Sequence, residues 1–150
     1  AWKPSRQLVP PCNQCMTGIF RMWSGILTGV AILGLLQGAM LLARRSLFSI
    51  GICNPAGPFG LAVSFWLLGG VFLLASAFFL WQWRHETDRV RAFFWFLLFS
   101  AGASNMLERL WYGCVFDFIH LPGLPYFNVA DILLTASVVF LVWKQGKHIP

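Results

Sequence analysis

Four long apolar runs, separated by short polar segments, set the pattern of this chain. They cover residues 23–42, 59–80, 92–105 and 129–143, and their polar interruptions are few and mostly uncharged. Each run approaches the ~20 residues that a helix needs to cross roughly 30 Å of hydrocarbon. Lipid offers the backbone no hydrogen-bond partners, and the runs lack the two-residue alternation of membrane barrels, so they indicate helices. The pattern predicts an all-α membrane protein with four transmembrane helices.

The composition supports this class of protein and excludes others. The 150 residues are 58% hydrophobic and 11% charged, with a mean hydropathy of +0.69, whereas a soluble domain has roughly 25% charged residues. So few charges speak against a soluble enzyme, a disordered tail and a nucleic-acid binder. The length suits one domain. We expect a cytoplasmic N-terminal tail over 1–21, a transmembrane domain over 22–143 and a cytoplasmic C-terminal tail over 144–150.

The basic residues predict the direction in which the helices cross the membrane. With four spans, both tails lie on the same side as the loop at 82–91. That side carries Lys3, Arg6, Arg21, Arg84, Arg89, Arg91, Lys144 and Lys147, and the other side carries Arg44, Arg45 and Arg109. Because segments rich in Lys and Arg stay in the cytoplasm, both termini are predicted to be cytoplasmic. The net charge of +6 is then a topology signal and not a nucleic-acid patch.

The four cysteines allow several interpretations. Cys12 and Cys15 have the spacing of half a zinc site or of a redox pair, and we expect an inert, reduced pair in the cytoplasm. Cys53 and Cys114 both fall on the outer side, where they could form a disulfide or be two unrelated small apolar residues. We favour unrelated residues, and we expect no metal site.

Polar residues gather around the end of the third run and the start of the fourth. Asn105 precedes Glu108 and Arg109 by three and four residues, a spacing that puts the three on one helix face. Asp117 and Asp131 follow. Two carboxylates at the same depth repel, so one keeps a proton while the other is ionised. Such a pair can activate a water against a carbonyl, which is the chemistry of an aspartic protease.

Plainer interpretations of the same residues stay open at this point. Asn128 and Asp131 have the spacing of a helix N-cap followed by an acid in the first turn, where the acid would suit the helix dipole. Asp117 could be an ordinary loop carboxylate paired with Arg109. Spacing alone does not choose between these interpretations and a catalytic pair.

Four motifs in a fixed order resemble the signal peptidase II family, the prolipoprotein signal peptidases. The family pattern is Asn-x-Gly-x-Ala-Phe-Gly, Asn-x-x-Asp-Arg, Val-Asp-Phe and Asn-x-Ala-Asp. The matching segments are Asn54-Pro-Ala-Gly57-Pro-Phe59-Gly60, Asn105-Met-Leu-Glu-Arg109, Gly113-Cys-Val-Phe-Asp117-Phe118 and Phe127-Asn128-Val-Ala-Asp131. The resemblance covers roughly residues 33–143, and the ordered set is more specific than any single motif.

The resemblance implies a fold, an activity and a set of site residues. The fold has four transmembrane helices, both ends in the cytoplasm, and a small extracytoplasmic segment after the first helix, for which a β-like form is one option. The implied activity is that of an aspartic endopeptidase of the bacterial cytoplasmic membrane, with its site near the outer leaflet. Asp117 and Asp131 would be the catalytic pair. The residues that line the site and orient substrate or carboxylates would be Asn54, Asn105, Arg109 and Asn128.

The implied substrate is a lipid-modified prolipoprotein, cleaved just before its diacylglyceryl-cysteine. The lipid would lie in the bilayer between the helices. The 43–58 segment and the 114–128 loop would flank the peptide. Because water is the nucleophile, the resemblance implies no metal and no organic cofactor. We expect membrane lipids as further partners, no nucleic acid, and a monomer.

The chain departs from the family pattern at three places. Glu108 stands where the family has Asp, although an ion pair with Arg109 or with the polar cluster could persist. The Asp-Gln-x-x-Lys-like motif of the first span is not evident, since Gln37 is near the expected place and no Lys follows it. The segment between Asp117 and Asp131 is short, and its proline and glycine residues predict a compact turn in place of a lid helix.

Two other functions compete with the peptidase hypothesis. The departures from the family pattern motivate a non-catalytic relative that binds lipoproteins or serves as a subunit of a membrane complex. The four cysteines motivate a four-helix thiol oxidoreductase, although such an enzyme needs its Cys-x-x-Cys on the outer side and Cys12 and Cys15 fall on the reducing side.

Overall fold

The computed structural model describes residues 12–55 and 63–146, with side chains from residue 23 onward. Its elements follow in the order α1 (Cys12–Ser46), β1 (Ile52–Asn54), α2 (Phe65–His85), α3 (Arg89–Tyr112), β2 (Val115–Asp117) and α4 (Val129–Gly146). In this part of the chain, four helices are long and apolar enough to cross a membrane. The predicted four-span architecture is confirmed, and so is a small β-like segment after the first helix.

The helix boundaries follow capping residues more closely than the apolar runs. The second run begins at 59, but α2 begins at Phe65, because Ser64 caps it by accepting a hydrogen bond from the Leu67 amide at 3.3 Å. α3 is longer than the third run at both ends. Asp88 caps its start, accepting from the Val90 amide at 2.8 Å, and Gly113 ends it in a left-handed conformation with φ of 72°.

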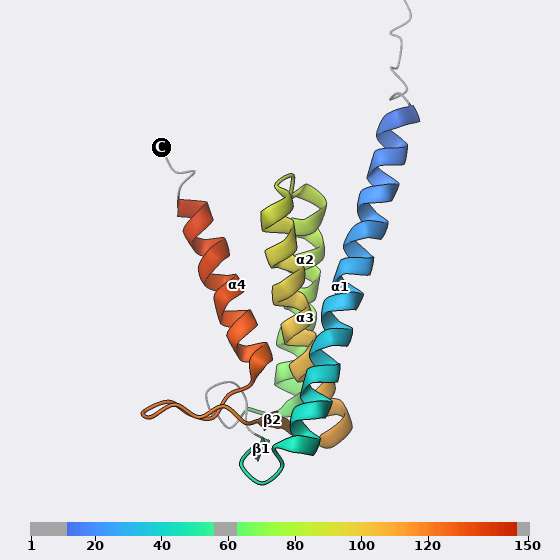
Figure 1. Ribbon diagram of the computed structural model, residues 1–150. Helices are drawn as coiled ribbons and strands as arrows, with labels where there is room; N and C mark the ends of the chain where they lie inside the picture. Colours follow the sequence, from blue (N-terminus) through green and yellow to red (C-terminus); the bar gives the residue numbers. More distant parts are fainter. Residues whose placement is uncertain (1–11, 56–62, 147–150) are drawn as a thin grey trace, which may run out of the picture.

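α1 is much longer than a membrane crossing requires. Its 35 residues correspond to about 52 Å of helix, against roughly 30 Å of hydrocarbon. It begins at Cys12, inside the segment predicted as a tail, and its first turns run beyond the ends of α2 and α3 in Figure 1. The side chains of Cys12 and Cys15 lie outside the described part of the chain, and so do residues 1–11. The predictions for them therefore stay predictions.

α3 is the central helix, packed against α1, α2 and α4 (Figure 1). Aromatic rings fill the N-terminal half of α3, where Phe99 stacks with Phe79 of α2, with ring centroids 4.8 Å apart. α1 lies close to α3 at Gly25, which faces the ring of Phe96. A Cβ at Gly25 would come within 2.7 Å of that ring. By contrast, large apolar side chains such as Trp66 on α2 are up to 84% exposed, as suits helices surrounded by lipid.

A row of polar contacts joins α1 to α3 along their length, and we call it the α1–α3 stripe. Ser100 donates to the Gly29 carbonyl at 3.2 Å. Gln37 donates to the Ser104 hydroxyl and carbonyl at 3.0 and 3.2 Å. Arg44 forms an ion pair with Glu108 at 2.6 Å. The three α3 residues are spaced four apart, so they share one face, and none is more than 1% exposed.

The two strands form a small antiparallel sheet at the end of the bundle opposite the start of α1 and the end of α4, which we call the sheet end (Figure 1). Ile52 pairs with Asp117, Cys53 with Phe116, and Asn54 with Val115. Phe116 packs with Met40 and Ala43 of α1. The sheet therefore fastens the segment after α1 to the segment after α3.

The opposite end, which we call the termini end, carries its own ion pairs. Lys144 of α4 bonds to Asp88, and Arg91 of α3 pairs with Glu86 at 2.9 Å. The hydrogen bond from Lys144, followed by that from the Val90 amide, lowers the pKa of the Asp88 carboxyl. Asp88 thus ties the α2–α3 turn to α4, and Glu86 ties it to α3, at the end of the bundle away from the sheet.

Candidate functional site

Asp117, the last residue of β2, lies buried at the sheet end and is only 3% exposed. Its two carboxylate oxygens accept hydrogen bonds from two asparagine side chains. Asn54 of β1 donates to Oδ2 at 2.9 Å, and Asn128 donates to Oδ1 at 2.8 Å. The carboxylate is thus held by residues that are distant from one another in sequence.

Asp131 stands in the first turn of α4, and a reciprocal pair of hydrogen bonds fixes it there. Its backbone amide donates to Asn128 Oδ1 at 3.1 Å, while its own Oδ2 accepts from the Asn128 amide at 3.2 Å. This is the geometry of a capping box. The N-cap interpretation of the sequence is therefore correct, and it does not compete with a functional one, because the cap is what orients Asp131.

Asn128 and Asn105 link the two carboxylates into one network. Asn105 donates to Asp131 Oδ1 at 2.7 Å, and Asn128 donates to Asn105 Oδ1 at 3.3 Å as well as to Asp117. Asn128 is fully buried. One residue therefore donates to both carboxylates, through its side-chain amide at Asp117 and through its backbone amide at Asp131.

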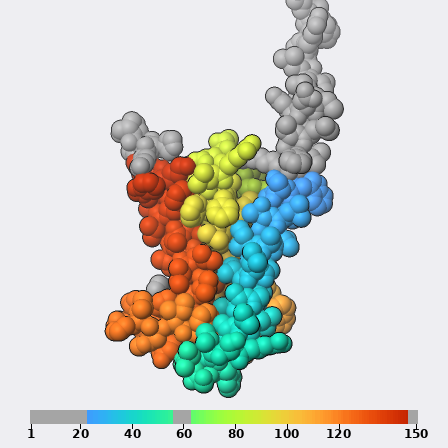
Figure 2. All heavy atoms as spheres, viewed as in Figure 1, coloured from blue at the N-terminus to red at the C-terminus, as the bar shows by residue number. Residues whose placement is uncertain are grey.

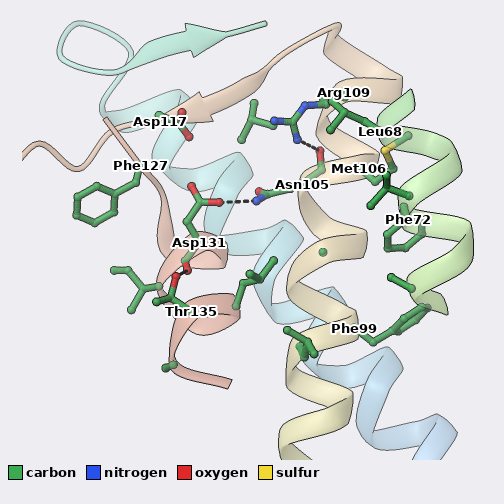
Figure 3. A pocket seen from close by; sticks show the side chains of 18 of the residues that line it. Leu68, Phe72, Phe99, Asn105, Met106, Arg109, Asp117, Phe127, Asp131 and Thr135 are labelled. Carbon is green, nitrogen blue, oxygen red and sulfur yellow. Dashed lines mark hydrogen bonds between the residues drawn. The ribbon is translucent and has the colours of Figure 1, made fainter. Parts of the chain in front are cut away.

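Arg109 brings a positive charge to the same place. It donates to the Asn105 carbonyl at 3.2 Å, one turn back on α3. Its guanidinium lies close enough to Asp131 and Asp117 to interact electrostatically with both. In Figure 3 the side chains of Arg109, Asn105, Asp131 and Asp117 gather at one end of a pocket. The exclusive Asp117–Arg109 ion pair considered from the sequence is not formed, since no salt bridge joins them among the described residues.

The two acids differ in their surroundings. Burial raises the pKa of the Asp117 carboxyl, and the nearby charge of Asp131 raises it further, while hydrogen bonds from Asn54 and Asn128 and the charge of Arg109 act in the opposite direction. Burial is the largest of these effects. Asp117 therefore holds its proton to a higher pH than an ordinary aspartate does.

An apolar groove of about 940 Å³ runs from this polar cluster along α2, α3 and α4. Its polar end consists of Asn54, Asn105, Arg109, Asp117 and Asp131. Its walls are mainly apolar, and they include Leu68, Phe72, Phe79, Phe99, Met106 and Phe127. The stick view shows the acids at one end and the apolar side chains of α2 and α3 along the wall (Figure 3). The groove can hold an apolar group with a polar junction at the acids.

The segment from Phe118 to Phe127 borders the groove as an extended arm. Ile119 and Phe127 exchange backbone hydrogen bonds at 2.9 and 3.0 Å, and the chain reverses near Gly123, whose φ is 82°. The turn lies where the proline and glycine residues predict it, and the segment contains no helix. However, it is an arm and not a compact turn, and in Figure 2 it projects sideways from the sheet end.

Glu108 does not belong to this cluster, which corrects the expectation from its spacing. Its carboxylate is fully buried against α1 and pairs with Arg44, not with Arg109. Arg44 also stacks over the Tyr112 ring, 4.1 Å from its centroid. Asn105 and Glu108 are three residues apart, but the turn of the helix is enough to point one at the groove and the other at α1.

Cys53 and Cys114 form a disulfide, with Cα atoms 5.5 Å apart. The interpretation of these two as unrelated small residues was therefore wrong. Sequence reasoning also missed Arg44 and Ser104, the partners of Glu108 and Gln37. The four-residue spacing of Ser100, Ser104 and Glu108 could have indicated a polar face that includes Ser104.

The fold and the site define the class of protein. It is a multi-pass membrane protein with two carboxylates at the polar end of an apolar groove. A family model described as signal peptidase (SPase) II matches residues 37–146. The chain therefore belongs to the signal peptidase II family, and the resemblance of its motifs is confirmed. Members of this family are peptidases of bacterial membranes.

Individual relatives agree with this assignment. The lipoprotein signal peptidase of Syntrophomonas wolfei is 29% identical over 144 residues, which cover 85% of this chain and 96% of the relative. That of Methylorubrum extorquens is 37% identical over 89 residues, 57% of this chain and 52% of the relative. Five further lipoprotein signal peptidases are matched over 42–54% of their length.

Solved structures support the same fold. A bacterial membrane enzyme determined by the in meso method superposes with a TM-score of 0.73 over 83% of this chain and 88% of the other, at 19% sequence identity. A second structure with the same description superposes with a TM-score of 0.72 over 85% of this chain, at 17% identity. At such low identity these two matches concern the fold alone.

Proposed function

We propose that this chain is an intramembrane aspartic endopeptidase that removes signal peptides from lipid-modified prolipoproteins, cleaving before the diacylglyceryl-cysteine. The observation that carries the proposal is the network in which Asn128 binds both Asp117 and Asp131 at the polar end of the groove. Family membership supplies the class of reaction, and the relatives' description as lipoprotein signal peptidases suggests the substrate.

The two carboxylates divide the proton transfers between them. Asp117, whose pKa is raised by burial, donates its proton to the oxygen of the scissile carbonyl. Asp131 acts as the general base and takes a proton from the attacking water. When the tetrahedral intermediate collapses, Asp131 gives this proton to the departing amine nitrogen, and Asp117 takes back the proton of the hydroxyl that becomes the new carbonyl. Arg109 and the asparagines hold the acids at fixed positions and offset their charge, so little rearrangement is needed during the reaction.

The groove and the topology suit a substrate that is half lipid and half peptide. The acyl chains lie against Phe72, Phe99 and Met106 in the groove, and the modified cysteine reaches the acids at its polar end. The excess of Lys and Arg at the termini end supports cytoplasmic termini and an active site near the outer leaflet. We propose that the protein works as a monomer, since one chain supplies both acids.

Replacing either acid tests this proposal. Asp117→Asn or Asp131→Asn should lower cleavage of a synthetic diacylglyceryl-peptide by at least about a hundredfold, the range for loss of a general acid or base. Asp88→Asn is the matched control, since it makes the same change at the termini end and Asn is an equally good N-cap. Full cleavage by either site variant would overturn the assignment of the pair. Lipopeptide binding without any cleavage by the natural chain would favour the non-catalytic relative.

A further inference from the structure

The Cys53–Cys114 disulfide joins the two chain segments that supply Asp117 and one of its hydrogen-bond partners. Cys53 immediately precedes Asn54 on β1, and Cys114 immediately precedes β2, which ends at Asp117. The bond therefore spans the sheet at the position where Asn54 reaches across to the carboxylate at 2.9 Å.

The disulfide and the polar site lie on opposite faces of this sheet. Side chains alternate between faces along a strand, and Cys53 is opposite Phe116 in the register. Phe116 packs on α1 and is not part of the groove lining, whereas Asn54, Val115 and Asp117 line the groove. The disulfide can thus clamp the sheet from behind without touching a substrate in the groove.

Three residues in each strand are too few to hold this register by backbone pairing alone, because isolated two-stranded ladders are marginal in water. A slip by one residue would turn Asn54 to the other face. The Asp117 Oδ2 atom would then lose this donor, and the carboxylate would be free to move.

We propose that the Cys53–Cys114 disulfide is a positioning element of the active site, which holds Asn54 against Asp117, so that peptidase activity depends on oxidation of these two thiols. This inference rests on the proposed peptidase function and on the sheet end lying outside the cytoplasm. Protein thiols are oxidised in that compartment.

Formation of the bond requires a protein disulfide as oxidant and proceeds by two exchanges. The thiolate of Cys53, the exposed partner, attacks one sulfur of the oxidant, breaks its disulfide and forms a mixed disulfide. The thiolate of Cys114, a residue 3% exposed, then attacks Cys53 Sγ and displaces the oxidant as a dithiol. Two electrons pass to the oxidant, and the two cysteines lose two protons.

The test compares oxidised and phosphine-reduced protein in detergent, with the diacylglyceryl-peptide as substrate and free thiols counted by mass spectrometry. We expect reduction to lower kcat about tenfold or more, since loss of a preorganised donor costs about 10² to 10³, while KM changes little because the groove is intact. Cys53→Ser/Cys114→Ser should show the same low kcat and no response to reductant. Cys12→Ser/Cys15→Ser, which keeps the disulfide, should respond as the natural chain does.

Two further measurements separate positioning from general stability and from failure of the proposed function. In the Asn54→Ala background, reduction should have less than about a twofold effect, because the bond acts through Asn54. Amide hydrogen exchange over Ile52–Asn54 and Val115–Asp117 should rise on reduction, while exchange in α3 stays unchanged. Unchanged strand exchange and unchanged kcat after full reduction would overturn the inference. Increased strand exchange, in a protein that cleaves no lipopeptide even when oxidised, would instead refute the peptidase function and leave the clamp in place.

Discussion

α3 carries polar side chains on two faces. One face is buried against α1, and the other lines the groove. Toward α1, Ser104 and Glu108 are fully buried and bound to partners on that helix. Toward the groove, Asn105 and Arg109, each the next residue along the chain, contact the carboxylate cluster and line an open space. Successive residues on an α-helix point about 100° apart, so adjacent positions belong to different environments.

The difference between the two faces shows how polar residues that join membrane helices can be distinguished from polar residues that line a functional site. On the α1 face Ser104 and Glu108 each have a partner on the neighbouring helix, neither residue lines the groove, and the contacts fasten two helices. On the groove face the polar groups converge on a cavity that is otherwise apolar. Ionisable residues in a span are candidates for function, but Glu108 pairs with Arg44 away from the groove, whereas Asp117 is also buried and lines the groove. The deciding observation is therefore whether the acid faces the cavity.

The largest expected effect on stability comes from removing the ion pair on the α1 face of α3. Arg44→Ala leaves the fully buried Glu108 carboxylate unpaired, which should lower the free energy of unfolding by about 3 kcal/mol. Denaturation in detergent micelles measures this loss, and Arg44→Met/Glu108→Leu should recover most of it. Cleavage per folded molecule should stay within about threefold of the natural chain. Loss of cleavage with full stability would instead assign Glu108 to the active site.

A change at Asn128, which binds the carboxylates at the polar end of the groove, should affect stability less and kcat more. Asn128→Ser keeps an N-cap oxygen for α4 but removes the amide that donates to Asp117. We expect kcat to fall about a hundredfold, as for loss of one preorganised donor, with little change in stability. Asn128→Ala should lose in addition about 1 kcal/mol of helix capping. If the serine variant keeps the natural kcat, the bridging role of the amide is wrong.

The smallest effect concerns the middle of the α1–α3 stripe. Gln37→Leu removes the hydrogen bonds to Ser104 and should cost about 0.6 kcal/mol, the average for such bonds between membrane helices. Ser137→Ala is the matched control, because among the described residues Ser137 bonds to the Leu133 carbonyl of its own helix and to no other helix. Unfolding in micelles should rank Gln37→Leu as the more destabilising. The reverse order would mean that the stripe contributes packing and not hydrogen bonding.

Much of the fold follows from local pattern. The four apolar runs predict the four helices, because a membrane span must satisfy its own backbone. Their ends were predicted less well, since Ser64, Asp88 and Gly113 act through local hydrogen bonds and backbone conformation that hydropathy does not register. Asn128 was recognised as a cap from its spacing alone, but its bond to Asp117 was not.

By itself, the sequence determined the number of spans, the class of protein, and the motif residues from Asn54 to Asp131 that gather at the groove, because hydropathy and short motifs are local properties. Only the tertiary structure decided which polar residues meet. Arg44 pairs with Glu108, Asn54 with Asp117, and Cys53 with Cys114 across more than sixty residues each. Such pairs depend on how helices rotate against one another and on the register of a three-residue ladder. Neither the rotation of the helices nor the register of the strands can be predicted from the spacing of residues along the chain.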